Sequence, residues 1–395
     1  MLGDDVAVVG GGLVGKAAAL ALAQAGLRVS LCGAGAAPAQ ATRGFAQRIY
    51  ALNSASRDLL QGLRAWDQIP GDRLQAVQGM RIMADGATLR FDAYAQGVEA
   101  LAWIAESDAI ERALDLALRF ERGVRAVPDP VAEARSTPDG WELELRGGGR
   151  LHAGLLVGAD GRSSQVREWS GIGLRARPYE QTAVVCNFAC AAPHGAAALQ
   201  TFTADGGVLA LLPLPGQQVS LVWSAPDTLA AELRQLSPEQ LAQRVEQQLD
   251  ALQAGHLAPL SAAGAVGSWA LVLQRAERVV AEGVALLGDA AHVVHPMAGH
   301  GLNLGLQDVQ ALAAVLRRRS AGEPLGHLPV LQRYARARAE QVLALELATD
   351  GLHRLYSPGL RWLAPLRALG LRATDHLPLL KSWLAGYASG RSVLS

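Results

Sequence analysis

The first thirty residues alternate between apolar runs and glycine-rich turns, a pattern typical of an α/β fold. Residues 6–9 form a short, fully apolar run, which predicts a parallel strand buried on both faces. Residues 13–25 are rich in alanine and leucine and end at Gly26, which predicts a helix with a glycine stop. Residues 27–31 predict a second strand. The chain therefore begins with a strand–turn–helix–strand unit.

The pattern changes twice further along the chain. From 80 to 91 and from 179 to 224, apolar runs alternate with Gly, Pro and Asp turns, which predicts short strands of an antiparallel sheet in a separate lobe. Near 284–287 the signature of a buried parallel strand returns, so the first lobe is predicted to be discontinuous in sequence. From residue 330 onward the chain is mostly helical and is interrupted by prolines.

Length and composition agree with two lobes and exclude several classes of protein. The chain has 395 residues, of which 50% are hydrophobic. A chain of this length is too long for one compact core. The formal net charge is zero, so nucleic acid is not an expected partner. Three cysteines form no disulfide framework. Asp4 and Asp5 stand where a signal peptide needs basic residues, and no run of about 18 apolar residues occurs. We expect a cytoplasmic protein, or one peripheral at the inner face of the membrane.

A glycine motif follows the first predicted strand at once. Gly10 permits a tight turn, Gly12 lets the backbone approach a pyrophosphate, and Gly15 lets helix and strand pack closely. The amino end of the predicted helix then faces the phosphates with its positive dipole. This predicts dinucleotide binding. The acid that should follow the second strand to bind a ribose is missing, because Gly33 stands there.

Two further motifs place a carboxylate directly after a predicted strand. Asp160 and Gly161 follow the apolar residues 155–157, where the carboxylate could accept hydrogen bonds from a ligand or simply form a turn. Asp289 follows the apolar residues 284–287, at a strand end of the kind that binds ligands in doubly wound folds.

A loop rich in Gly, Pro and His comes next and precedes a predicted helix over 302–316. The amino end of that helix points into the loop, an arrangement that suits a ring becoming an anion on reduction, as a flavin does. His292, His295 and His300 also raise the possibility of a metal site. We expect no metal, because no cysteine lies close and a Gly/Pro loop does not align ligands on one face.

These three motifs, in this order and at these separations, resemble the single-component FAD-dependent aromatic hydroxylases, and more narrowly the ubiquinone-biosynthesis hydroxylases. The narrower resemblance rests on stretches such as 48–53, 179–183, 220–224 and 349–352 and covers nearly the whole chain. It implies FAD as cofactor, NAD(P)H as electron donor, O2, and a prenylated phenol or quinone intermediate as substrate. No second Gly-x-Gly-x-x-Gly motif occurs, so the nicotinamide is expected to approach the flavin without a domain of its own.

The resemblance also implies an architecture: a discontinuous Rossmann-like FAD-binding lobe, an antiparallel β-sheet substrate lobe and C-terminal helices. The FAD-binding domain is predicted over 1–75, 100–176 and 272–328, the substrate-binding domain over 76–99 and 177–271, and the helical region over 329–395.

Residue roles follow from the same resemblance. The implied cofactor-binding residues are Gly10, Gly12, Gly15, Arg48, Asp160, Gly161, Asp289, Gly299, Gly301, Leu302 and Asn303. Pro296 begins the loop that flanks the isoalloxazine ring and is grouped with the catalytic residues. The family usually carries Gln where His300 stands, and this imidazole could titrate near the flavin or simply replace the amide as a neutral hydrogen-bonding group; we favour the simple replacement.

Hydroxylation of a phenol is helped by a base that begins to remove its proton. His295 and His194 are the candidates, although His194 could equally be an ordinary, partly exposed histidine. Two other functions remain open: hydroxylation of a different phenol, and a non-catalytic role as a subunit of a quinone-biosynthesis complex.

The C-terminal region mixes arginines with Leu, Tyr356 and Trp362, which suits a membrane surface. The same face could instead cover the FAD lobe, and we favour that covering role.

Overall fold

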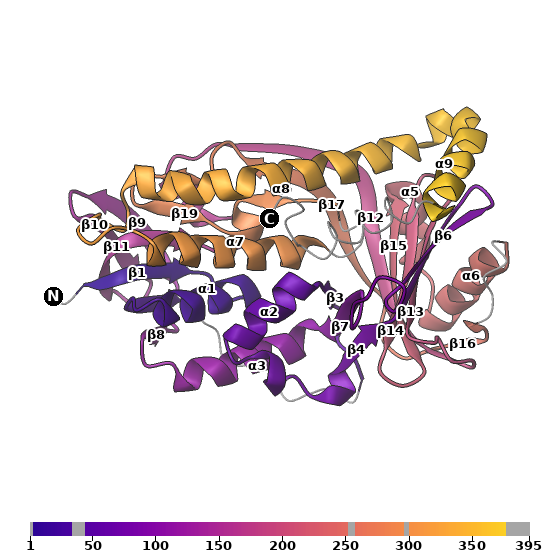
Figure 1. The fold of residues 1–395 in the computed structure, drawn as a ribbon, viewed down its shortest axis with the longest axis horizontal. Coiled ribbons are helices and arrows are strands. Elements are labelled where there is room, and N and C mark those ends of the chain that lie inside the picture. Colours follow the sequence, from indigo (N-terminus) through magenta and orange to yellow (C-terminus); the bar gives the residue numbers. More distant parts are fainter. Residues whose placement is uncertain (1–2, 34–43, 252–256, 296–299, 377–395) are drawn as a thin grey trace.

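The computed structural model describes residues 3–33, 44–251, 257–295 and 300–376. It is elongated, with a parallel sheet at one end, a second sheet at the other and the long helix α8 running along both (Figure 1). The strand order of the first sheet is β18-β19-β11-β1-β2-β8, and the hairpin β9–β10 joins it through β11. Its strands are β1 (Asp4–Val9), β2 (Val29–Cys32), β8 (Val124–Val127), β9 (Val131–Thr137), β10 (Gly140–Leu145), β11 (Arg150–Gly158), β18 (Val280–Ala281) and β19 (Val284–Leu286).

The apolar run at 6–9 is buried on both sides of this sheet, as predicted. Val6 and Val8 face the core under the helices, whereas Ala7 and Val9 face the β9–β10 hairpin and α4. The helices of this lobe are α1 (Leu13–Gln24), α2 (Ser54–Gly62), α3 (Ser107–Phe120), α4 (Gln165–Trp169), α7 (His300–Arg317) and α8 (Leu328–Leu355), with 3-10 turns η1 (Trp66–Gln68), η2 (Gly71–Arg73) and η4 (Gly288–Ala290). Because β19 pairs in parallel with β11, the lobe is discontinuous in sequence.

The second sheet has the order β20-β17-β12-β15-β14-β13-β5-β6, with β16 beside β12. It is antiparallel except where β13 pairs with β5. Its strands are β5 (Gly79–Ala84), β6 (Ala87–Asp92), β12 (Leu174–Cys190), β13 (Ala197–Phe202), β14 (Val208–Leu214), β15 (Gln218–Pro226), β16 (Leu260–Ala262), β17 (Gly267–Ala276) and β20 (His292–Val293). Helices α5 (Asp227–Leu233) and α6 (Pro238–Ala251) cover one face, and β3 (Ile49–Leu52), β4 (Leu74–Val77) and β7 (Ala102–Glu106) form a small third sheet between the lobes.

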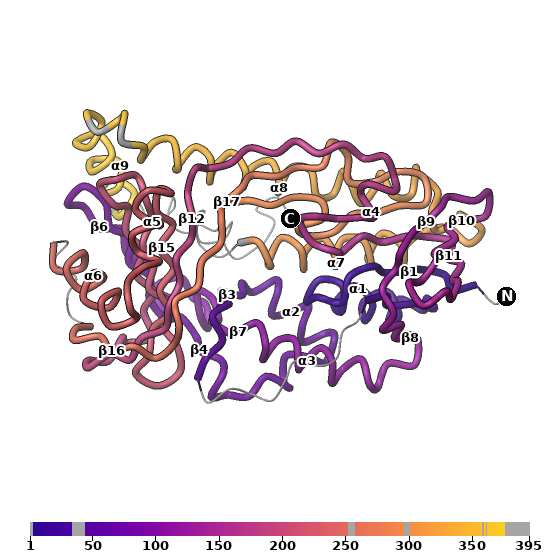
Figure 2. Tube along the Cα trace, turned by 180° about the vertical axis from the view of Figure 1, so that it is seen from behind, coloured from indigo at the N-terminus to yellow at the C-terminus, as the bar shows by residue number. Residues whose placement is uncertain are grey.

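One strand prediction is wrong. The pattern from 179 to 224 predicts short strands, but β12 begins already at Leu174, runs for 17 residues and, with its partner β17, connects the two lobes (Figure 2). Pro178 lies inside it because the pairing shifts register between Pro178 and Thr182, where Glu180 has a φ of 55°. A bulge absorbs a residue that cannot donate to the ladder.

The segment that follows α8 covers a different lobe from the one expected. After α8 come η6 (Pro358–Leu363) and α9 (Ala364–His376), which packs against β6 of the second sheet. Tyr356 is buried against Phe202 of that sheet, with ring centroids 3.7 Å apart. The covering role over the FAD lobe is therefore wrong, and the side chain of Trp362 stays exposed.

Candidate active site

Four strands of the parallel sheet end at one edge, because β1, β2, β11 and β19 run in the same direction. β1 leads into the turn at Gly10, β11 into Asp160, β19 into Asp289 and β2 into Gly33. This carboxyl edge is where doubly wound sheets bind ligands. The structure therefore brings together residues of three motifs that are far apart in the sequence.

The glycine turn combines a close backbone contact with an open space. A Cβ at Gly15 would lie 1.8 Å from the carbonyl oxygen of Gly10, and a Cβ at Gly10 itself, with a φ of 121°, would lie 2.2 Å from that of Ala159. By contrast, no described atom lies within 4 Å of a Cβ built on Gly12, and Gly12 begins α1 without a side-chain cap. A helix amino end beside open space fits a pyrophosphate.

Asp289 presents an accessible carboxyl at the same edge. Its side chain is exposed to solvent, yet enough protein surrounds it that desolvation raises the pKa of the carboxyl, with His292, Arg48 and Arg162 acting in the opposite direction. Exposure combined with desolvation indicates a group on the floor of a concave site. Such a carboxyl can accept a hydrogen bond from a ligand hydroxyl.

Arg48 lies between the two lobes. Its guanidinium carbon is 5.5 Å from the ring centroid of Trp269 on β17, and its charge acts on both Tyr50 and Asp289. Burial raises the pKa of Tyr50, so that the phenol keeps its proton. Trp269 was missed at the sequence level, because only the pairing of β17 with β12 brings it to this place.

The carboxylate of Asp160 is hydrogen-bonded within its own turn. Its carboxylate accepts hydrogen bonds from Ser164 Oγ at 2.5 Å and from the backbone N–H groups of Gln165 and Val166 at 2.7 and 3.1 Å. These bonds cap α4, so the structure gives Asp160 the turn-forming role that was one of its two interpretations. Gly161 has a φ of 80° and open space beside it among the described atoms.

The flavin-loop residues are only partly described. Pro296 and Gly299 lie outside the described residues. Gly301 lies in the first turn of α7, and a Cβ built on it would meet no described atom within 4 Å. Leu302 is buried in the core of the first lobe, so its side chain supports α7 and leaves only its backbone to face a ligand.

Asn303 holds α7 against its neighbours. Its Oδ1 accepts from the backbone N–H of Asn53 at 3.0 Å and from Ser56 Oγ at 2.7 Å, and its Nδ2 donates to the carbonyl of Ala51 at 2.7 Å. These bonds fix the amino end of α7 to β3 and α2, so that a cofactor contact from Asn303 would also use the backbone.

His295 is buried beside Gln181 of β12. Its Nε2 lies 3.0 Å from Gln181 Oε1, and Gln181 in turn donates to the carbonyl of Gly206, which identifies Nε2 as the donor. The rings of Tyr179 and His353 lie 4.8 and 5.7 Å from its ring centroid. Burial lowers the pKa of His295 to about 3, and His353 adds to the effect. The imidazole is therefore neutral at physiological pH.

His194 has both ring nitrogens occupied by backbone groups. Nδ1 accepts from the N–H of Ala196 at 3.0 Å, so Nε2 carries the proton and donates toward the carbonyls of Leu214 and Gly216 at 3.0 and 2.8 Å. This is the geometry of a histidine that stabilises a turn, and the same ring would have to break these bonds to act as a base.

The face of the second sheet opposite α5 and α6 contains a strip that is only partly covered. Leu212 and Ala198 pack against the small sheet between the lobes. Phe202 and Val208 pack under Tyr356. Between these two covered rows lies a central row of paired residues, formed by Gly267, Val185, Val222, Ala210, Gln200 and Ile82.

Two residues in the middle of this central row, Val222 and Ala210, keep accessible surface although the rows on both sides are covered. The row is mostly apolar, with Gln200 as its polar member. It begins at Gly267, next to Trp269 and hence beside Arg48. An apolar surface with one polar group, next to the candidate cofactor edge, is the composition of a small-molecule site.

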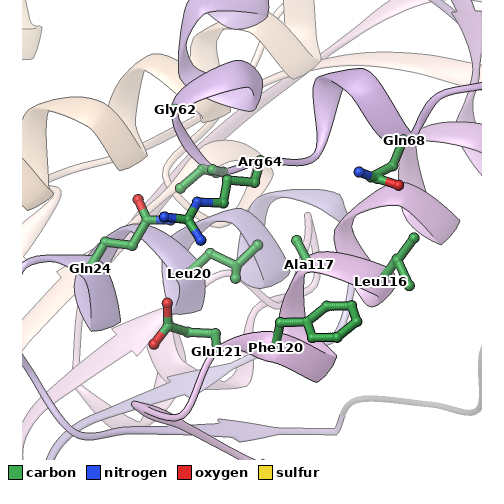
Figure 3. Close-up of a pocket in the computed structure, with 10 residues that line it drawn as sticks. Leu20, Gln24, Gly62, Arg64, Gln68, Leu116, Ala117, Phe120 and Glu121 are labelled. Carbon is green, nitrogen blue, oxygen red and sulfur yellow. The ribbon is translucent and has the colours of Figure 1, made fainter.

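The pocket drawn in Figure 3 is a different feature. It lies between the carboxyl end of α1, the end of α3 and the turn after α2, and Gln24, Arg64 and Phe120 are among its lining residues. It is at the opposite end of α1 from Gly12 and contains none of the predicted site residues. We therefore assign the active site to the strand edge.

Two further expectations can be compared with the described residues. No three His, Cys, Asp or Glu side chains among them gather in a way that could hold a metal ion. Gly33, which stands in place of an acid, has a φ of 73° and donates its N–H to the carbonyl of Val127. A residue other than glycine would be strained in that backbone conformation.

The glycine turn, the open space at Gly12 and the accessible carboxyl of Asp289 fit FAD, and comparisons with known proteins agree. Residues 4–346 match the FAD binding domain family. The chain is 36% identical to 3-demethoxyubiquinol 3-hydroxylase of Escherichia coli over 390 residues, covering 98% of each chain. It is 35% identical to ubiquinone hydroxylase UbiL of Rhodospirillum rubrum, covering 98% of this chain and 89% of that one.

A solved structure shows the same fold. The p-nitrophenol 4-monooxygenase PnpA of Pseudomonas putida superposes with a TM-score of 0.75 at 19% identity, covering 99% of both chains. The fold, the FAD-binding domain and the sequence relatives lead to one conclusion. The chain is an FAD-dependent monooxygenase and belongs to the family of ubiquinone-biosynthesis hydroxylases.

Proposed function

We propose that this enzyme hydroxylates an aromatic ring of a prenylated intermediate of ubiquinone biosynthesis, using O2 and NAD(P)H. The observation that carries the proposal is the partly covered, mostly apolar central row beside the FAD edge, in which Val222 and Ala210 keep accessible surface. A prenyl tail can lie along Val222, Ala210 and Ile82, because apolar burial contributes about 0.8 kcal/mol per CH2 group. The relatives named as ubiquinone hydroxylases support the same substrate class.

The chain's own residues bind and orient. Gly12 and the amino end of α1 hold the diphosphate, Asp289 accepts from a cofactor hydroxyl, and Arg48 bridges the cofactor edge and Trp269. Once reduced, bound FAD supplies the activation of O2. His295 is a weak proton acceptor at a pKa of about 3, so it serves best by orienting the loop that follows it. A His295→Gln variant that loses the acidic limb of a pH–rate profile, where a base becomes protonated, would restore the base role.

The substrate class is tested with purified, FAD-loaded enzyme. We expect kcat/KM for a geranylated phenol to exceed that of the unprenylated phenol by at least about tenfold. Ala210→Phe, which fills the middle of the central row, should abolish this preference and leave turnover of the small phenol within about twofold. Equal kcat/KM for the two phenols in the wild-type enzyme would contradict a prenylated substrate and favour a small soluble phenol.

Deletion of the gene identifies the position in the pathway. We expect an under-hydroxylated prenyl phenol to accumulate, and its structure to name the ring carbon that is modified. The competing function, a non-catalytic subunit of a biosynthetic complex, predicts instead a purified protein that is colourless and remains so with added FAD.

The outer face of α9 is proposed as a contact with the membrane surface, where a prenylated substrate resides. Trp362 in η6 and Leu366 and Leu369 on α9 are 73, 68 and 65% exposed. The spacing of Leu366 and Leu369 places them on one side of α9, while Leu371 packs toward Tyr356. Residues 350–376 carry four arginines and two acids. Arg354 pairs with Asp350 and Arg367 with Asp85, and the excess of arginine in this segment favours anionic lipid. Among the described helices, none is long and apolar enough to cross a membrane.

Flotation with vesicles containing anionic lipid tests this contact. We expect the wild-type protein to float, and Trp362→Ser/Leu366→Ser/Leu369→Ser to lose most of that binding, because each exposed apolar side chain would insert at the interface. Phe120→Ser is the matched control, since Phe120 is 80% exposed on α3 of the other lobe. Wild-type protein that stays in the soluble fraction would contradict the contact.

A further inference from the structure

Asp308 on α7 is completely buried and joins three elements. Its Oδ2 accepts from the backbone N–H of Gly288 at 3.0 Å and from His292 Nε2 at 2.7 Å, and its Oδ1 accepts from Arg338 Nε on α8 at 2.7 Å. Burial alone would raise the pKa of this carboxyl, but His292 and Arg338 hold it below its ordinary value. Asp308 therefore stays ionised, with every bond formed by a group from another part of the chain.

The bond to Gly288 controls the turn that carries Asp289. Gly288 has a φ of 56°, and its Cα lies against α7 so closely that a Cβ on Gly305 would come within 3.2 Å of it. Two contacts therefore fix the turn. Gly305 packs against the Cα of Gly288, and the Asp308 carboxylate accepts a hydrogen bond from the N–H of Gly288. A backbone N–H buried without such an acceptor is costly, so loss of the acceptor favours a different turn.

Arg338 holds the carboxylate in place from the long helix α8. Besides Asp308 it donates to the carbonyl of Leu304 at 3.3 Å and to the side chains of Gln307 and Gln341. Its guanidinium is buried, and buried ion pairs keep a unique geometry when all their donors are satisfied. α8 is therefore connected to the Asp289 turn through two side chains.

We propose that Asp308, Arg338 and His292 are positioning residues for the cofactor: they hold the Gly288–Asp289 turn in the conformation that binds FAD, without touching FAD themselves. This rests on the proposed contact between Asp289 and FAD. It makes the affinity for FAD depend on α8, a helix whose far end also covers the substrate sheet through Tyr356.

Two double variants separate positioning from simple stability. Both Asp308→Asn/Arg338→Met and Asp308→Leu/Arg338→Met remove the buried charges, and such replacements are often tolerated when they pack well. Only the Asn variant keeps an oxygen that can accept from Gly288. We expect Asp308→Leu/Arg338→Met to raise the Kd for FAD about tenfold or more, and Asp308→Asn/Arg338→Met to stay within about threefold of wild type.

The measurements are a fluorescence titration of the FAD-free proteins with FAD, their melting temperatures, and the visible flavin spectrum at saturating FAD. Equal Kd values for the two double variants, or a rise only in proportion to lost stability, would overturn the proposal. If the proposed contact between Asp289 and FAD is itself wrong, an Asp289→Ala variant will bind FAD with the same affinity as wild type.

A second pair of variants, with milder substitutions, tests the positioning role if the double variants do not fold. Arg338→Lys retains the charge but loses the forked geometry, and it should release FAD several-fold faster than wild type. Arg333→Lys is the control on the same helix, because Arg333 is exposed and pairs with Glu323 at the surface. Equal release rates for the two variants would contradict a positioning role for Arg338.

Discussion

Replacing Gly15 with alanine is expected to destabilise the first lobe by about 3 kcal/mol or more and to yield protein without FAD. The added Cβ would lie 1.8 Å from the carbonyl oxygen of Gly10, a backbone atom that cannot move aside as a flexible side chain could. Overpacking of this kind forces the surrounding backbone to shift, so α1 must separate from the turn. The purified variant should show a lowered melting temperature and little flavin absorbance.

Gly12→Ala is the matched control at the same turn. Gly12 has a φ of −81°, which alanine adopts readily, and no described atom lies within 4 Å of its added Cβ. The variant should melt within a few degrees of the wild-type protein in the absence of FAD. Its affinity for FAD should nevertheless fall about tenfold or more, because the methyl group enters the space proposed for the diphosphate. Wild-type affinity in Gly12→Ala would exclude that placement.

The cofactor edge was predictable from sequence because its signals are local. A glycine spacing directly after an apolar strand defines the turn at Gly10, and the apolar residues before Asp289 define a parallel strand end. Parallel strands that share a sheet must end at the same edge, so two motifs nearly 280 residues apart could be assigned to one site without a structure.

The supporting contacts could not be predicted, because they depend on how distant elements pack. Nothing near Asp308 in the sequence indicates that it accepts from Gly288 and Arg338. The partly covered central row follows from the register of six strands and from what covers its neighbours. His194 and Asp160 had two interpretations each, and only their hydrogen bonds, made by Ala196 and Ser164 among others, assign them to turns.

Acidification is expected to weaken the protein through His295. Its pKa is about 3 in the folded protein and close to 6.5 in an unfolded chain. Between these values the unfolded state binds a proton that the native state does not, so stability falls as the pH falls below about 6.5. From pH 7 to pH 4 this one group should lower the free energy of unfolding by roughly 3 kcal/mol.

Carboxylates also titrate in this range, so the measurement is the difference between wild type and His295→Gln in urea unfolding at several pH values. Glutamine can keep a donor toward Gln181 Oε1 but cannot gain a proton. At pH 7 the His295→Gln variant should be less stable than wild type, because it loses contacts with Tyr179. The difference between the two free energies of unfolding should therefore shrink by about 3 kcal/mol at pH 4. A deficit that is constant with pH would mean that His295 is not desolvated in the native state.

His353→Gln distinguishes the two causes of the low pKa. Burial is the larger cause at His295 and the charge of His353 the smaller, because a ring with no access to water loses most of the hydration that a charged imidazole needs. His353→Gln should therefore keep most of the acid sensitivity that His295→Gln removes. If both variants removed it equally, repulsion between the two rings would dominate, and the burial of His295 would be looser than its contacts with Gln181 and Tyr179 indicate.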